Sequence, residues 1–160
     1  MLLFIALLLH ALSGFVTSSA SIDCQSSTNN MFEPPADYNG HRYYQSTYYY
    51  LDAQQAERMC LSCGWYLAEI NTEGEFRFVQ TLARNKNTEG LLLSGNDMTK
   101  EGYWVFQTSM EPVKFFDWST GNPSNYQGKE HFMSIHRTYN YQMNDVSFEP
   151  PGNYKFLCEM

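Results

Sequence analysis

The carboxyl-terminal part of the chain carries oxygen-bearing side chains of the types that bind calcium. An amide and a hydroxyl flank the proline of Asn122-Pro-Ser124, and Glu130 and Asn144-Asp145 follow. Carboxylate and amide oxygens are hard donors, which Ca²⁺ takes in sets of about 6–8. The segment is rich in turn residues, so donors from separate stretches can converge without sharing a helix or strand. We therefore predict a metal site formed by Asn122, Ser124, Glu130, Asn144 and Asp145.

The quality of these donors limits the strength of the predicted site. Only Glu130 and Asp145 carry formal charge, and Ser124 is a short, weak ligand. Because affinity falls with fewer charged ligands, we expect weak binding, with a Kd of about 10⁻⁴–10⁻³ M. The same residues also suit a structure without metal, since Asn-Pro-Ser-Asn is a good turn sequence and Asn144-Asp145 suits a turn cap. Both interpretations stay open from the residues alone.

Histidines and tyrosines beside these donors offer further chemistry. His131 and His136 suit either a zinc-binding pair or solvent-facing positions on a strand. Tyr126, Tyr139 and Tyr141 flank the loop, where they would either stack on a ligand or simply lie exposed. The sequence has no Ser-His-Asp order, glycine-rich phosphate loop or His-Glu helix motif, so we do not expect an enzyme.

The charge balance of the chain excludes one class of partner. Its net charge is −7, from 17 acidic and 10 basic residues. Phosphate recognition needs clustered lysines and arginines, so nucleic acid is not an expected partner, whereas divalent cations are compatible with this balance. Aromatic residues make up 16% of the chain, which is enough for a packed core and argues against disorder.

The first residues are typical of a secretory signal peptide. Residues 1–20 contain an apolar run that ends in small residues, and Gly14 and Thr17 interrupt it before it reaches the length of a membrane span, which is about 20 residues. We expect residues 1–20 to be removed, residues 21–160 to form one domain, and the protein to be secreted and extracellular without membrane insertion.

Four cysteines point to disulfide bonds rather than to thiol chemistry. Cys24, Cys60, Cys63 and Cys158 form an even set in a small secreted chain, and four cysteines allow three pairings. The Cys60-Leu-Ser-Cys63 spacing would also suit zinc or redox chemistry. A zinc ribbon needs a second close pair, however, and Cys24 and Cys158 lie far apart.

The order of predicted elements is that of an α+β fold. Asp52 caps a helix that ends at Gly64, and the capping box Thr72-Glu-Gly-Glu75 begins a second helix that closes at 85–88. Short strands are predicted at 41–50, 91–93, 102–106, 132–135 and 155–158. The stretch between 107 and 130 shows little apolar periodicity, and loops of this length are usually functional or mobile.

Several motifs in this order resemble the C-type lectin-like domain family, in the form of secreted perlucin-like lectins. They are Ala56-Glu-Arg-Met-Cys60, Leu67-Ala-Glu-Ile70, Ser94-Gly-Asn-Asp97, Glu101-Gly-Tyr-Trp104, Phe116-Asp-Trp118, Gly121-Asn-Pro123 and Phe156-Leu-Cys158-Glu159. The resemblance implies two helices packed on short antiparallel sheets, with a long ligand-binding loop. It also implies disulfides Cys60–Cys158 and Cys24–Cys63.

The resemblance assigns roles to the predicted donors. It implies that Asn122, Ser124, Glu130, Asn144 and Asp145 hold Ca²⁺ beside a cis proline, and that the ion accepts two hydroxyls of a glycan or glycoprotein. Asn122, Ser124, Glu130, Asn144 and Tyr126 would then contact the sugar. Family members that bind mannose read Glu-Pro-Asn and those that bind galactose read Gln-Pro-Asp, and this chain has neither motif. The alternative implied role is therefore a calcium-independent matrix, biomineral or protein-binding protein with a degenerate sugar site.

A second departure from the family concerns a disulfide near the sugar site. The two cysteine positions are occupied here by Phe132 and Phe148. We expect the two rings to pack together, because an aromatic pair adds about 0.5–1.5 kcal/mol beyond the area that it buries.

Overall fold

The computed structural model describes Cys24, residues 30–150 and residues 152–160. The predicted signal peptide, residues 1–20, lies outside the described residues. Within them, no helix has the length and apolar character needed to cross a membrane.

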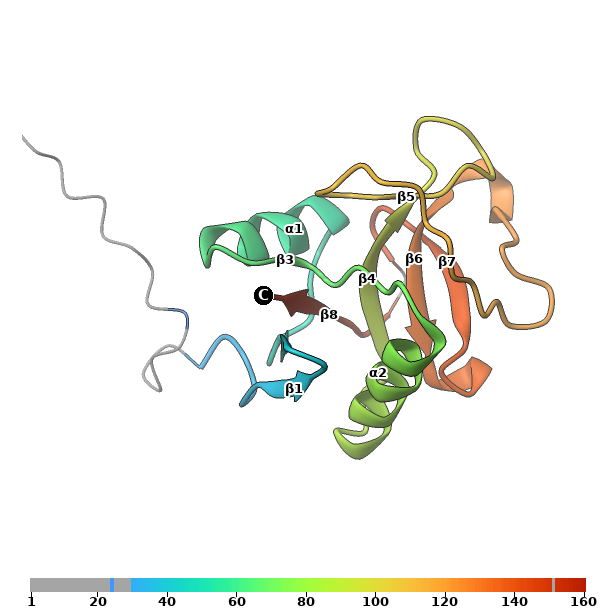
Figure 1. Cartoon of the computed structure of the whole chain (residues 1–160). Helices are drawn as coiled ribbons and strands as arrows, with labels where there is room; N and C mark the ends of the chain where they lie inside the picture. The colour runs from blue at the N-terminus through green and yellow to red at the C-terminus, as the bar shows by residue number, and fades with distance from the viewer. Residues whose placement is uncertain (1–23, 25–29, 151) are drawn as a thin grey trace, which may run out of the picture.

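Among the described residues, two α-helices and a mixed sheet form the domain, which confirms the predicted α+β class (Figure 1). The helices are α1 (Ala53–Ser62) and α2 (Glu73–Asn85). The strands are β1 (Ala36–Tyr38), β2 (His41–Gln45), β3 (Tyr66–Leu67), β4 (Gly90–Asn96), β5 (Val105–Phe106), β6 (Glu130–His136), β7 (Met143–Ser147) and β8 (Tyr154–Glu159). Their order in the sheet is β1-β2-β8-β4-β6-β7, with β3 paired to β8 and β5 to β4.

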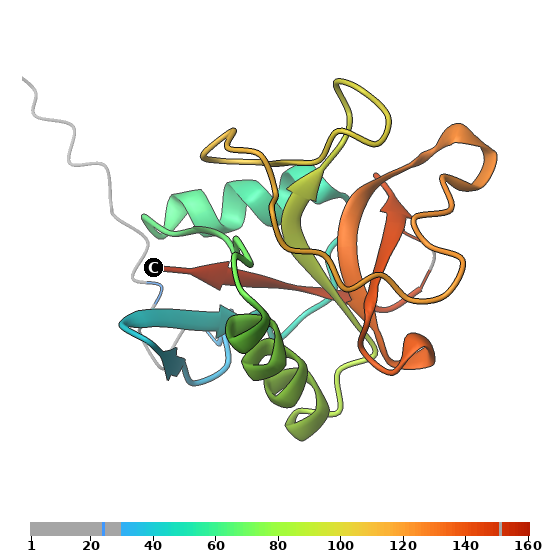
Figure 2. The ribbon, with the colours of Figure 1, turned by 45° about the vertical axis from the view of Figure 1, so that its right-hand side comes forward.

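The named strands pair in antiparallel fashion, as the resemblance implies, except at one place. Strands β4 and β8 pair in parallel, with Leu91 opposite Lys155, whereas β4 and β6 pair in antiparallel fashion. The chain reaches β8 only at its end, after β7 and a return across the sheet, so its direction there is set by topology rather than by a hairpin. The parallel pair brings the two halves of the sheet together, as the turned view in Figure 2 shows.

Alternation along β4 divides the apolar core into two clusters on opposite faces of the sheet. Leu91 and Leu93 belong to the cluster that contains Phe76 and Val79 of α2. Leu92 belongs to the cluster that contains Ala56 of α1. Because neighbouring side chains of a strand point to opposite faces, one fully buried strand contributes to both cores.

Both disulfides join the expected cysteines. Cys60 is bonded to Cys158, which ties α1 to β8, and Cys24 is bonded to Cys63. The predicted aromatic replacement is also present, since the rings of Phe132 and Phe148 lie 5.8 Å apart between centroids at an angle of 56°.

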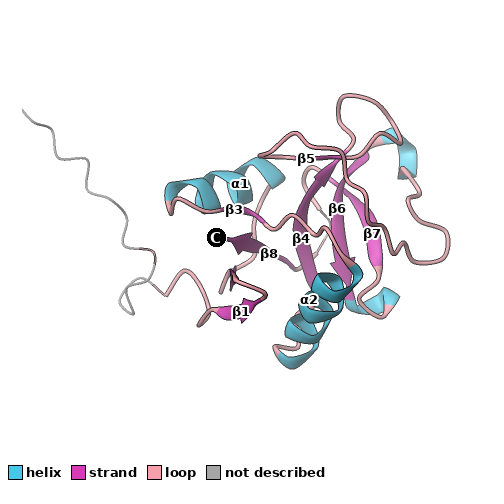
Figure 3. Cartoon of the chain, viewed as in Figure 1, coloured by secondary structure: helices cyan, strands magenta, loops and turns pink. Residues whose placement is uncertain are grey.

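Two local predictions need correction. Residues 102–104 are not a strand, because Gly102 has φ +75° and its N–H donates to the Asp97 carboxylate, which closes a turn before β5. The strand predicted at 41–50 is shorter, because β2 ends at Gln45. Asn144 and Asp145 lie inside β7, paired with Ser134 and Met133 of β6. Long connections, drawn pink in Figure 3, approach the β6–β7 end of the sheet, where these two residues lie.

Candidate functional site

Asp145 holds the turn that contains the proline. Its Oδ1 accepts the backbone N–H of Ser124 at 2.9 Å, and its Oδ2 accepts that of Asn125 at 2.5 Å. The Asn122–Pro123 peptide bond is cis, and Asn125 has a left-handed backbone with φ 41°. Asp145 is only 3% exposed although β7 lies at the edge of the sheet. A buried carboxylate on a strand thus fixes the position of a surface turn.

Glu130 makes a second connection to the same turn. Its Oε2 accepts the Ser124 hydroxyl at 2.8 Å and the Tyr126 N–H at 2.9 Å. No described residue donates to the other carboxylate oxygen, Oε1. Glu130 is the first residue of β6. The loop before this strand is therefore held by the residue at which it joins the sheet.

The two asparagines of the predicted donor set make different hydrogen bonds. Asn144 is 5% exposed, and its Oδ1 accepts the Ser134 hydroxyl at 3.0 Å while its Nδ2 donates to the Asp145 carbonyl. Asn122 donates from Nδ2 to the Ser119 hydroxyl at 2.7 Å. In each case the amide oxygen keeps at least one lone pair, which is what a cation would need.

All five predicted donors line one open pocket of about 370 Å³. Tyr126, Tyr139 and His136 also line it, and the sequence had suggested all three as residues near the donors. Thr138, Val146 and Tyr154 line it as well, and nothing in the sequence had singled them out. Burial lowers the pKa of His136 and raises that of Tyr154, so both side chains are neutral near pH 7. The pocket therefore combines two carboxylates with a neutral aromatic wall.

The three tyrosines considered as ligand contacts do not behave alike. Tyr126 and Tyr139 are 66% and 40% exposed beside the pocket. Tyr141 belongs to the core: its hydroxyl donates to the Thr88 carbonyl at 2.9 Å, and the Arg84 guanidinium lies 5.2 Å from the centre of its ring. The suggestion that Tyr141 contacts a ligand is therefore wrong.

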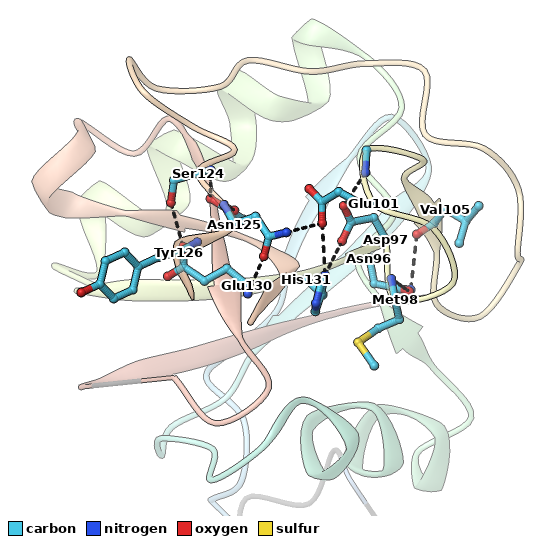
Figure 4. Close-up of polar contacts among 12 residues, drawn as sticks. Asn96, Asp97, Met98, Glu101, Val105, Ser124, Asn125, Tyr126, Glu130 and His131 are labelled. Atoms are coloured by element: carbon cyan, nitrogen blue, oxygen red, sulfur yellow. Dashed lines mark hydrogen bonds and ion pairs between the residues drawn. The ribbon is translucent and has the colours of Figure 1, made fainter. Parts of the chain in front are cut away.

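The two histidines considered as a zinc pair lie at opposite ends of β6. At about 3.3 Å per residue, the strand separates them by roughly 16 Å, which excludes a shared ion. His131 instead meets Asp97, with 3.0 Å between Nδ1 and Oδ1, and Glu101, with 3.7 Å between Nδ1 and Oε2. Figure 4 shows this second cluster beside the Glu130 group.

Asn125 lies between the two clusters (Figure 4). Its Nδ2 donates to Glu101 Oε2 at 2.5 Å, while its backbone N–H donates to Asp145. In the sequence, Asp97 and Glu101 stand out only as parts of family motifs. Their proximity to His131 depends on pairing between β4 and β6, and no local pattern in the sequence carries that information.

Lysines and arginines do not neutralise these acids. Within the described part of the chain, no lysine or arginine forms an ion pair with Asp97, Glu101, Glu130 or Asp145. Four carboxylates thus lie in two adjacent clusters where His131 is the one side chain in an ion pair with any of them, among the described residues.

Comparison with known proteins gives a consistent picture, although no family model matches the chain. Salivary C-type lectin 2 of Aedes albopictus is 34% identical over 115 residues, which are 65% of this chain and 74% of the relative. Lectin BRA-3 of Megabalanus rosa is 33% identical over 127 residues, covering 78% and 74%. Perlucin of Haliotis laevigata is 29% identical over 107 residues, covering 66% and 67%.

Solved structures show the same fold at lower identity. Human lithostathine aligns with a TM-score of 0.70 at 21% identity, over 80% of this chain and 97% of that one. The carbohydrate-recognition domain of the mouse scavenger receptor C-type lectin aligns with a TM-score of 0.68 at 23% identity, over 80% and 96%.

Proposed function

This chain belongs to the C-type lectin family, and from that premise we propose that it is a secreted lectin that binds glycan hydroxyls through one weakly held Ca²⁺. The ion would be held by Asn122, Ser124, Glu130, Asn144 and Asp145. When bound, it would supply a positive centre that accepts two neighbouring sugar hydroxyls. The relatives whose names describe lectins support carbohydrate binding as the general activity.

The observation that carries the proposal is the convergence of two carboxylates on one pocket. Glu130 and Asp145 both face the proline turn from neighbouring strands, and together they balance the charge of one Ca²⁺. Glu130 Oε1 accepts no hydrogen bond from the described residues, so this oxygen can bind an ion without breaking a contact. Residues of these types fit Ca²⁺, which prefers oxygen ligands.

Neutral donors make up the rest of the set and explain why binding should be weak. The Ser124 hydroxyl donates a hydrogen bond to Glu130, and the lone pairs of its oxygen remain available to bind an ion. Sites with few charged ligands bind Ca²⁺ with a Kd of about 10⁻⁴–10⁻³ M. The proposal therefore requires the calcium concentrations of an extracellular fluid.

A thermal melt tests the ion. Calcium at about ten times its Kd stabilises a protein by about 1.4 kcal/mol, so CaCl₂ at about 10 mM should raise the Tm of the mature chain by a few degrees. Glu130→Gln keeps the shape of the side chain and removes one of the two charges of the site. Calcium should therefore no longer raise the Tm of this variant. Glu111→Gln, an exposed acid outside the pocket, is the matched control and should respond like wild type. A wild-type Tm that CaCl₂ does not change would refute the proposal.

Glycan binding tests the sugar contact separately. Tyr126→Ala should weaken calcium-dependent binding to immobilised glycans about 2- to 10-fold, because an aromatic contact contributes about 0.5–1.5 kcal/mol. Tyr103→Ala is the control, since Tyr103 is similarly exposed and does not line the pocket. Equal affinities of the two variants would remove Tyr126 from the binding surface.

One observation favours a second function. The donors already satisfy one another, because Asp145 accepts two N–H groups and Ser124 donates to Glu130 without an ion. This arrangement, with the net charge of −7, also suits a calcium-independent protein that contacts mineral, matrix or another protein. Adsorption to calcium carbonate that survives Asp145→Ala, combined with glycan binding that ignores EDTA, would favour this alternative.

A further inference from the structure

We propose that a pocket between α1 and the end of β4 binds a small amine that carries an aromatic group. The pocket has a volume of about 360 Å³, and it is lined by residues of α1, β4 and β6 and of the segments that follow β4, β5 and β7. Small-molecule sites are hollows of about 300–1,000 Å³, mostly apolar, with a few polar groups. The pocket shares no residue with the proposed calcium pocket, so this proposal does not depend on calcium.

Exposed apolar side chains gather at this pocket. Met98 is 57% and Met110 63% exposed, and Phe148 also lines the pocket. The three side chains come from segments after β4, β5 and β7, which are far apart in the sequence. Single exposed apolar side chains are normal, whereas several around one hollow are typical of a ligand-binding surface. Methionine sulfur packs favourably against aromatic rings, so this group of side chains favours an aromatic ligand.

Two phenylalanines form an aromatic wall where the resembled family has a disulfide. Phe132 and Phe148 occupy the two cysteine positions. Phe132 is buried, and its ring lies 5.8 Å from that of Phe148 at an angle of 56°. Aromatic rings prefer tilted and offset contacts, so a third ring can pack against the exposed side of Phe148. The wall is therefore a feature of this chain's own residues.

A chain of hydrogen bonds in the pocket ends at Glu57 of α1. Asn96 Nδ2 donates to Gln107 Oε1 at 2.7 Å, and Gln107 Nε2 donates to Glu57 Oε2 at 3.2 Å. Within the described part of the chain, no group donates to Glu57 Oε1. The ion pairs of the described residues do not include this carboxylate either. The network thus leaves one charged acceptor oxygen for a ligand.

The charge of Glu57 selects the polar group of the ligand. Among the described residues that line the pocket, Glu57 is the one that carries charge. A primary amine resembles the lysine side chain, whose pKa is about 10.4, so it is protonated at pH 7 and can donate to Glu57. An anion would be repelled by this carboxylate in a chain of net charge −7. A purely apolar molecule would cover the carboxylate without giving it a partner, which costs free energy.

A titration with 2-phenylethylamine, followed by NMR of the methionine methyl groups, tests the site in the mature chain. The signals of Met98 and Met110 should move in one saturable step, with one amine per chain. Met160 is the internal control, because it is 50% exposed and does not line the pocket. No movement up to tens of millimolar amine would overturn the proposal. Equal movement of the Met160 signal would do the same, because it would indicate non-specific attraction to an acidic chain.

Two variants test the polar and the aromatic contact separately. Glu57→Gln should bind the amine about 5-fold more weakly, because it loses an ion pair. Phe148→Ala should bind about 2- to 10-fold more weakly, because it loses a ring contact. Glu73→Gln and Phe116→Ala are the matched controls and should bind like wild type, since neither residue lines the pocket and Phe116 is as exposed as Phe148, at 40%. Wild-type affinity in both pocket variants would contradict the assignment.

A neutral ligand of the same size tests the choice of an amine. 2-Phenylethanol should bind wild type about 5-fold more weakly than the amine does, and the two ligands should bind Glu57→Gln equally. Equal affinities for wild type would show that charge plays no part, and the proposal would be wrong. It would also be wrong if sedimentation showed a dimer that Met98→Glu dissociates, because a second copy would then cover the pocket. Amine binding should be the same in EDTA and in CaCl₂, so failure of the calcium response would leave this result unaffected.

Discussion

Replacing Asp145 by asparagine should separate the structural role of this carboxylate from its role as a metal ligand. In the native chain both carboxylate oxygens accept backbone N–H groups, from Ser124 at 2.9 Å and Asn125 at 2.5 Å. The amide introduced by Asp145→Asn would keep one acceptor oxygen and place an NH₂ group against the second N–H. Two donors would then face each other at a position where the side chain is almost fully buried.

The expected loss of stability follows from the number of bonds. A hydrogen bond to a charged group contributes about 1.5–3 kcal/mol, and a buried donor left without acceptor costs about 1–3 kcal/mol. Asp145→Asn loses one charged bond completely and weakens the other, so the free energy of unfolding should fall by about 3–4 kcal/mol. For a domain of this size, each kcal/mol lowers the Tm by roughly 2–4 °C, which gives a fall of about 10 °C.

The assay is a thermal melt in EDTA, with amide exchange of Ser124 and Asn125 as a local readout. Glu130→Gln is the comparison, because its remaining oxygen still accepts from Ser124 and Tyr126, and its loss should stay below about 1 kcal/mol. Both variants should lose the calcium response. If Asp145→Asn melts like wild type in EDTA and its two turn amides exchange no faster, the carboxylate does not hold the turn.

Three further changes probe the scaffold. Phe132→Ala should cost about 3–4 kcal/mol in urea unfolding and Phe148→Ala about 1 kcal/mol, because Phe132 is 7% and Phe148 40% exposed; equal losses would contradict this. Serine at both Cys60 and Cys158 should lower stability by about 4–5 kcal/mol, since the bond closes a separation of 98 residues, and a loss under about 1 kcal/mol would refute the estimate. Burial raises the pKa of Glu159, so its charged form destabilises the fold; wild type should lose stability relative to Glu159→Gln as the pH rises from 4.5 through the folded-state pKa, and a constant difference would refute it.

Local signals in the sequence predicted both helices well. Asp52 accepts the Gln55 N–H at 2.7 Å and Thr72 accepts the Glu75 N–H at 3.2 Å, so both predicted caps are present. The capping box is only half formed, however. Glu75 accepts the Asn71 N–H and the Tyr43 hydroxyl instead of the Thr72 N–H. A capping pattern fixes where the helix begins, but a partner on another strand decides where the glutamate points.

The site was less predictable, because strand pairing assembles it. The five proposed calcium donors could be named from a family resemblance, yet nothing local placed Asn144 and Asp145 in a strand, since Met-Asn-Asp-Val-Ser reads equally well as a turn. The cluster of Asp97, Glu101 and His131 depends on a contact between residues 34 apart in the chain. Histidine spacing suggested the wrong pair, because His131 and His136 are close in sequence but separated by the length of β6.

The hydrogen bonds of the proline turn also bear on how strongly an ion can bind. Asp145 and Glu130 accept four bonds from the turn, so the turn is held by acids that a calcium ion would use as ligands. This preorganisation removes part of the ordering cost of binding. Each accepted N–H also draws negative charge away from the oxygen, however, and Ser124 must turn its proton from Glu130 before its lone pairs can face the ion. The first effect favours binding and the second opposes it. A turn that keeps its shape in EDTA, together with a millimolar Kd, is therefore the expected combination.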